Sequence, residues 1–195
     1  LTYTASSDTL TEKSVFRCTP RTGRVEHILV ELPHGDGAAP TWSLANEDEP
    51  RCEAELLSTV ANQSLPVGDA AESGSESEGR NQIDRWRIQL TPPRLGAFEL
   101  QASRTLPFVE NAPIGLPRLP EAEEVSGSVR IATLGRTNII IEETTLRAIP
   151  IPFGANGAGR TIRAAYRYDD PFLTTAAHSI RLARQEDEPD IHWAW

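Results

Sequence analysis

Alternation of apolar and polar side chains with a period of two is the strongest pattern in this 195-residue chain. In residues 84–90 a tryptophan, an isoleucine and a leucine alternate with two arginines and a glutamine. The same alternation returns at residues 98–102 and 162–168. Successive side chains of a β-strand point to opposite faces, so this period indicates strands with one buried face. No comparable stretch shows the period of about 3.6 residues of an amphipathic helix, so the pattern predicts an all-β fold.

Turn-forming residues separate the predicted strands. The chain contains 15 prolines and 13 glycines, which is typical of a turn-rich β protein. The Pro/Gly loop at 91–96 predicts a β-hairpin between the strands on either side of it. A second hairpin is predicted between residues 126–133 and 137–144, with its turn at 134–136. Residues 52–60 would serve either two helical turns or a strand.

Two breaks in composition divide the chain. Residues 68–81 are rich in glycine, serine and acidic residues and contain no large apolar side chain, which predicts a flexible acidic loop. Residues 107–120 contain four prolines, which predict an extended connection. We therefore expect an antiparallel β-sandwich, Ig-like or jelly-roll-like, over residues 1–112. A second, smaller β module is expected over residues 113–195.

The C-terminal sequence ends in an apolar alternation. Ile191, Trp193 and Trp195 would share one face of an extended strand, and two tryptophans left in water would expose a large apolar area. The chain also begins with leucine rather than methionine. We interpret it as part of a longer polypeptide, with the second module incomplete at its C-terminus. Trp193 and Trp195 are the predicted interface residues, toward this chain's own sheet or toward the next segment.

The charge of the chain bears on its partners. Acidic residues outnumber basic ones by 28 to 19, and this balance disfavours nonspecific binding to nucleic acid or anionic lipid. No stretch approaches the roughly 18 consecutive apolar residues of a membrane-spanning helix. We therefore expect no nucleic-acid partner and no membrane contact from this segment. The expected partners are other domains of the same polypeptide or another protein.

The sequence contains no catalytic or metal-binding motif of the common kinds. It lacks G-x-S-x-G, H-E-x-x-H and C-x-x-C, so we expect neither an enzyme nor a metal or cofactor site. Cys18 and Cys52 are the two cysteines, 34 positions apart. Outside the cytoplasm they could form a disulfide, which would stabilise the fold by roughly 3–4 kcal/mol. The alternative is a pair of buried thiols in a cytosolic protein.

Trp42 is the candidate ligand-binding residue. It lies in a predicted loop rich in glycine and proline, and it is not part of a predicted core strand. An exposed aromatic ring can stack on the apolar face of a sugar. Trp42 therefore supports an alternative function, that of a carbohydrate-binding or accessory module of a polysaccharide-active enzyme.

Two segments resemble parts of a known class of proteins. The sequences WRIQLTPPRLGAFEL at 86–100 and IGLPRLPEAEEVSGSVRI at 114–131 are similar to repeated β-sandwich ectodomains of large bacterial envelope proteins. One lysine against eighteen arginines is also typical of a GC-rich bacterial genome. The resemblance covers residues 86–131 and carries no catalytic residue. It implies a non-enzymatic structural or interaction role in a larger extracytoplasmic protein of the cell envelope or surface.

Overall fold

The computed structural model describes residues 1–36, 39–45, 52–61, 82–111, 113–144, 146–151, 157, 159–168 and 180–185. These residues form thirteen strands and no helix, which confirms the predicted all-β fold. The strands are β1 (Thr2–Ala5), β2 (Thr9–Cys18), β3 (Val25–Pro33), β4 (Thr41–Leu44), β5 (Cys52–Ala61), β6 (Gln82–Arg94), β7 (Phe98–Pro107), β8 (Pro113–Ile114), β9 (Gly127–Leu134), β10 (Ile139–Thr144), β11 (Arg147–Ala148), β12 (Arg160–Tyr168) and β13 (Ile180–Arg184). None of the described residues forms a helix long and apolar enough to cross a membrane.

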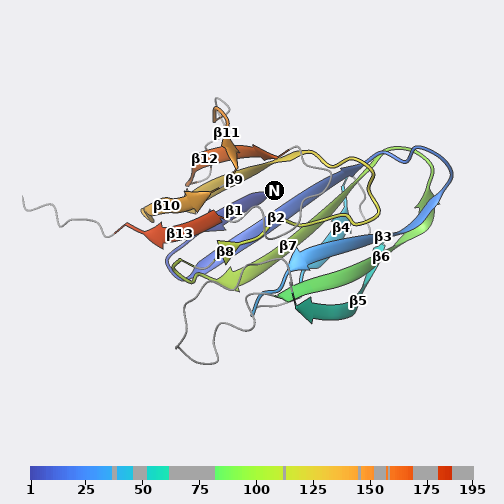
Figure 1. Ribbon diagram of the computed structural model, residues 1–195, viewed down its shortest axis with the longest axis horizontal. Coiled ribbons are helices and arrows are strands. Elements are labelled where there is room, and N and C mark those ends of the chain that lie inside the picture. The colour runs from blue at the N-terminus through green and yellow to red at the C-terminus, as the bar shows by residue number, and fades with distance from the viewer. Residues whose placement is uncertain are drawn as a thin grey trace, which may run out of the picture.

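The strands form one large sheet and two small ones. The large sheet has the order β11-β12-β9-β1-β2-β7-β4, and the small sheets have the orders β3-β6-β5 and β10-β13-β8. Figure 1 shows the two small sheets next to each other in front of the large one. Side chains from one face of the large sheet enter the hydrophobic cores under both small sheets. The architecture is therefore sandwich-like, with a second layer that is split into two parts.

Each small sheet closes its own hydrophobic core. The first core lies under the β10-β13-β8 sheet and includes Tyr3 and Ile180. The second core lies under the β3-β6-β5 sheet and includes Trp42, Trp86 and Ile88. Full burial of an aliphatic side chain contributes about 1.5–3 kcal/mol to folding. The two cores together are the main source of stability for the layered arrangement.

A buried ion pair lies on the inner face of the large sheet. Glu12 on β2 and Arg104 on β7 are cross-strand neighbours, and their side chains are 3% and 4% exposed. Arg104 Nε donates to Glu12 Oε2 at 2.7 Å, and Arg104 Nη2 donates to the Pro33 carbonyl oxygen at 2.7 Å. Because Pro33 ends β3, this arginine also joins the large sheet to the β3-β6-β5 sheet.

Both predicted hairpins are wrong. β6 pairs with β3 and β5, whereas β7 pairs with β2 and β4, so the chain crosses from one layer to the other between them. β9 likewise belongs to the large sheet, whereas β10 pairs with β13. Alternation indicates that one face of a strand is buried, but it does not indicate which strand pairs with it. Ile88 of β6 and Leu100 of β7 are buried in the same core, which the two strands approach from opposite layers.

The large sheet extends across the boundary expected at residue 112. β9 pairs in parallel with β1 and antiparallel with β12, so strands from both regions share one sheet. The first core also combines Leu10 with Val129. Strand pairing therefore contradicts a separate second module, and the β1–β9 pair departs from a wholly antiparallel order. Residues 68–81, the predicted flexible loop, lie outside the described residues.

Candidate functional site

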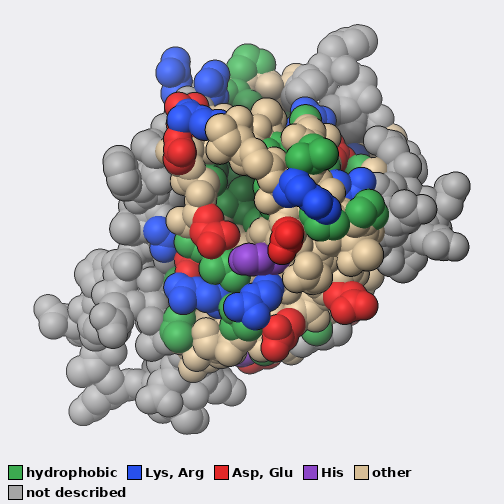
Figure 2. All heavy atoms as spheres, turned by 90° about the vertical axis from the view of Figure 1, so that its right-hand side faces the viewer, with side chains coloured by type: hydrophobic (Ala, Val, Ile, Leu, Met, Phe, Trp, Pro, Cys, Tyr) green, Lys and Arg blue, Asp and Glu red, His purple; other side chains and the backbone are tan. Residues whose placement is uncertain are grey.

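A hollow of about 880 Å³ opens at the end of the molecule where β2 leads into β3. Its walls come from the connection at residues 19–24, the segment 119–124 and the first half of β3. Figure 2 looks onto this end and shows hydrophobic side chains inside a recess, with basic and acidic side chains around it. Loops at the ends of a β-sandwich often bind partners because the rigid sheets hold them in place.

The floor of the hollow is apolar. Cys18, Val25, Phe98 and Leu119 line it, and all four are partly buried against the second core. Cys18 ends β2 and Phe98 begins β7, and the two are cross-strand partners. The floor is therefore the end of the second core that the strands leave uncovered.

The rim of the hollow carries charges of both signs. Arg21 contacts the carboxylates of Glu123 and Glu124, with a distance of 3.0 Å from Nη2 to Glu124 Oε1. Arg24 and Glu26 also line the rim. The side chains of Arg21 and its two partners are exposed, so each pair is worth about 0–1 kcal/mol. These pairs join the two loops and can exchange partners at little cost.

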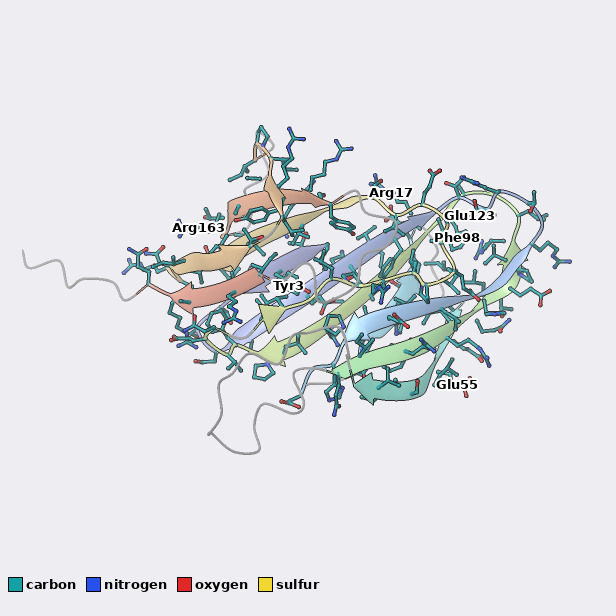
Figure 3. All side chains as sticks on the ribbon, in the orientation of Figure 1. Tyr3, Arg17, Glu55, Phe98, Glu123 and Arg163 are labelled. Atoms are coloured by element: carbon teal, nitrogen blue, oxygen red, sulfur yellow. The ribbon has the colours of Figure 1, made fainter. Side chains whose placement is uncertain are left out.

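A second ion pair lies beside the hollow. Arg17 Nε donates to Glu99 Oε2 at 3.1 Å, and Gln101 Nε2 donates to Glu99 Oε1 at 3.0 Å. These two hydrogen bonds hold the pKa of the Glu99 carboxyl below its usual range, and the bond from Arg17 has the larger effect. Figure 3 places Arg17, Phe98 and Glu123 at the same end of the molecule.

In this structure no disulfide bond joins Cys18 to Cys52, the candidate pair. Cys18 ends β2 in the large sheet, whereas Cys52 begins β5 in the opposite layer. Packed sheets lie about 10 Å apart, and a disulfide needs Cα atoms within about 7 Å. Burial raises the pKa of the Cys18 thiol to about 11. At neutral pH this thiol is protonated and is a poor nucleophile.

Trp42 is not available to a ligand. The side chain lies on β4, is 7% exposed, and packs with its ring centroid 6.4 Å from that of Phe16 and 6.2 Å from that of Trp86. The prediction of an exposed Trp42 is wrong because the residue belongs to a short strand that alternates like the others, with Leu44 also buried. A buried indole cannot stack on a sugar, so the carbohydrate-binding alternative loses its candidate residue.

One polar cluster was not predicted from the sequence. His34 Nδ1 lies 2.8 Å from Asp84 Oδ1, and Thr59 Oγ1 donates to the same oxygen at 2.7 Å. These residues come from three separate segments, and no local motif marks them. Within the described ranges, no group of three or more His, Cys, Asp or Glu side chains is arranged to hold a metal ion.

The residues of the hollow were also not predicted, because the sequence does not show that segments 19–24 and 119–124 meet. Trp193 and Trp195, the predicted interface residues, lie outside the described residues. The chain matches no protein-family model, and no curated protein is significantly similar to it in sequence.

Proposed function

We propose that this chain is a non-enzymatic interaction region of a larger extracytoplasmic protein. In this proposal the hollow binds a segment of another domain of the same polypeptide or of another protein. The observation that carries the proposal is the apolar floor, open to solvent and surrounded by a rim of both charges.

The composition of the hollow fits a polypeptide segment. Protein–protein interfaces combine an apolar centre with a polar rim, which is the arrangement of this floor and rim. Arg21 and Arg24 can pair with acidic side chains of a partner, and Glu123 and Glu124 with basic ones. The exposed pairs of Arg21 can be replaced by pairs with a partner at small cost.

The floor is also held in position before a partner binds. Its four apolar side chains pack against the second core, and Cys18 and Phe98 are fixed by strand pairing. A binding surface that is already ordered loses less conformational entropy on association. This favours a binding role for the hollow.

Site-specific photocrosslinking in cells of the source organism tests the proposal. p-Benzoylphenylalanine replaces Thr22, which lines the hollow, or Glu55, which is exposed on β5 away from the hollow. We expect one discrete polypeptide adduct from position 22, identified by mass spectrometry, and none from position 55. Arg24→Glu should reduce the adduct. Equal adducts at both positions, or none above background, would contradict the proposal.

The proposed location has its own test. A protease added to spheroplasts, which retain an intact cytoplasmic membrane, should cleave the full-length protein within this region if it is extracytoplasmic. Complete protection in spheroplasts, with cleavage only after lysis, would contradict that location.

A further inference from the structure

The outer face of the large sheet, turned away from both cores, is rich in basic side chains. We call it the basic face. Its exposed basic residues come from β2, β9, β11 and β12; they are Lys13, Arg17, Arg130, Arg147, Arg160 and Arg167. Among the described strand positions of this face, Glu99 is the single acidic residue, and it pairs with Arg17.

Strand register places these basic residues on the same side. Arg147 is directly opposite Arg167, and Arg130 is opposite the residue two positions before Arg167. Arg130 is also opposite Thr2, which is in turn opposite Lys13. Opposing residues and every second residue along a strand point to the same face of a sheet. The alternate positions of β1, β2, β9 and β12 contribute to the first core, so the basic face is the opposite face of the sheet. Ala132, Ile162 and Ala165 are buried on this face, between its exposed basic side chains.

Hydroxyl groups occupy much of the remaining surface. The hydroxyl side chains at outward positions are Thr2, Thr4, Thr9, Thr11, Thr41, Ser43, Ser103, Thr105 and Ser128. From β11 to β2 the face spans five adjacent strands, which is about 19 Å at the usual spacing between strands. No aromatic side chain occurs at the outward strand positions that the structure describes.

Arg17 is paired with Glu99, whereas three other basic side chains of this face have no such partner among the described residues. Lys13, Arg130 and Arg147 form no ion pair with any other described residue. This concentration of positive charge occurs on a chain whose net charge is −9. An anionic partner would be complementary to this face.

We propose that the basic face binds an acidic polysaccharide, a sugar polymer that carries carboxylates. Guanidinium groups form paired hydrogen bonds with carboxylates, and the threonine and serine hydroxyls can bond to sugar hydroxyls. The exposed basic and hydroxyl side chains extend over several adjacent strands, which suits an extended polymer. Proteins that bind single-stranded nucleic acid stack bases on aromatic rings, and the described part of this face offers none. The inference goes beyond the proposed function, because it concerns the outer face of the large sheet, which shares Arg17 with the hollow.

Binding of polygalacturonate to the full chain tests this proposal, measured by affinity electrophoresis at about 50 mM salt, where screening is weak. Arg130→Glu and, independently, Lys13→Glu should each weaken binding by about tenfold, from a lost attraction and a new repulsion. The matched control is Arg87→Glu, an exposed charge reversal on the outer face of the β3-β6-β5 sheet. It should change affinity by less than about twofold.

Several outcomes would overturn the proposal. The first is that the unaltered chain does not bind polygalacturonate. The others are that Arg130→Glu and Arg87→Glu lose affinity equally, or that the chain binds neutral dextran as tightly as polygalacturonate. Tighter binding to single-stranded DNA or to phosphatidylglycerol vesicles would assign the face to another class of partner. An unchanged far-UV circular dichroism spectrum shows that a variant is folded. If Arg130→Glu does not fold, Lys13→Glu provides the same test. Failure here would leave crosslinking at position 22 unaffected, so the two proposals are separable.

Discussion

At the scale of single residues, burial changes what a side chain can do. Cys18 has the side chain of a nucleophile, but packing against the second core raises its pKa to about 11. Trp42 has the ring of a sugar-binding residue, but it lies beside Phe16 and Trp86. In both cases the local sequence names the chemical group, and the packing around the group decides its availability.

The Cys18 thiol should react slowly. In a Cys52→Ser variant, alkylation by iodoacetamide at pH 8 should be about a hundredfold slower in the folded chain than in urea, because each pKa unit lowers the thiolate fraction tenfold. The thiol ionises less readily when folded, so the folded state should lose stability as pH rises from 9.0 toward 11. Mass spectrometry measures both rates, and equal rates would contradict the assignment. If no disulfide is present, iodoacetamide should alkylate both cysteines of the unaltered chain in urea without prior reduction.

The buried Glu12–Arg104 pair should be costly to break on one side. Arg104→Met leaves the carboxylate of Glu12 buried without its partner, which costs about 3–5 kcal/mol. Combining it with Glu12→Leu should recover most of the loss, because the buried charge is then removed as well. Urea unfolding of the two variants measures the difference. A single variant as stable as the unaltered chain would show that the pair is not buried as the structure has it.

At the scale of the strand, position within a sheet matters more than composition. β6 is the central strand of the β3-β6-β5 sheet and has a strand on each side. Its inner face carries Ile88, which is 0% exposed, whereas the adjacent Arg87 points to solvent. This strand therefore joins its sheet to the second core.

Two adjacent substitutions in β6 should differ strongly in effect. Ile88→Ala should lower the free energy of unfolding by about 2–5 kcal/mol through lost burial and a cavity. Arg87→Ala should change it by no more than about 0.5 kcal/mol, because the side chain is exposed. Urea unfolding followed by tryptophan fluorescence measures both. Similar losses in the two variants would mean that β6 does not present the faces described here.

At the scale of the whole molecule, one sheet carries two cores. The large sheet takes β1, β2, β4 and β7 from the N-terminal region, and β9, β11 and β12 from the C-terminal region. The first core depends on both regions, since Tyr3 and Leu10 pack with Val129 and Ile180. The two cores are therefore coupled through a common layer.

A fragment of residues 1–112 should not fold by itself. It lacks β9, which pairs with β1, and the C-terminal half of the first core, so Tyr3 and Leu10 would be exposed to water. The full chain should unfold in a single cooperative transition, because its cores share the large sheet. Circular dichroism and calorimetry measure these properties. A fragment with the spectrum of a folded β protein, or two separate transitions in the full chain, would support independent modules instead.

The sequence by itself determined the fold class and the buried face of several strands. Trp86, Ile88 and Leu90, which alternate in the sequence, are all buried. This could be predicted because the two-residue period follows from backbone geometry within one strand, and burial of apolar side chains requires no knowledge of the partner. The same reasoning identified residues 52–60 as a possible strand but could not choose between strand and helix, because the apolar run was short.

Only the tertiary structure decided which strands pair, where the cores lie and which charged segments meet. The turns after β6 and β9 lead the chain from one layer to the other and do not form hairpins, since the free energy of strand pairing depends on contacts between distant segments. Contacts between distant segments also bury Trp42 and place Cys18 in the hollow. The hollow itself exists because Arg21 and Glu123, 102 positions apart, are brought together at one end of the sheets. A local pattern encodes how a strand is exposed, whereas its neighbours are set by packing over the whole chain.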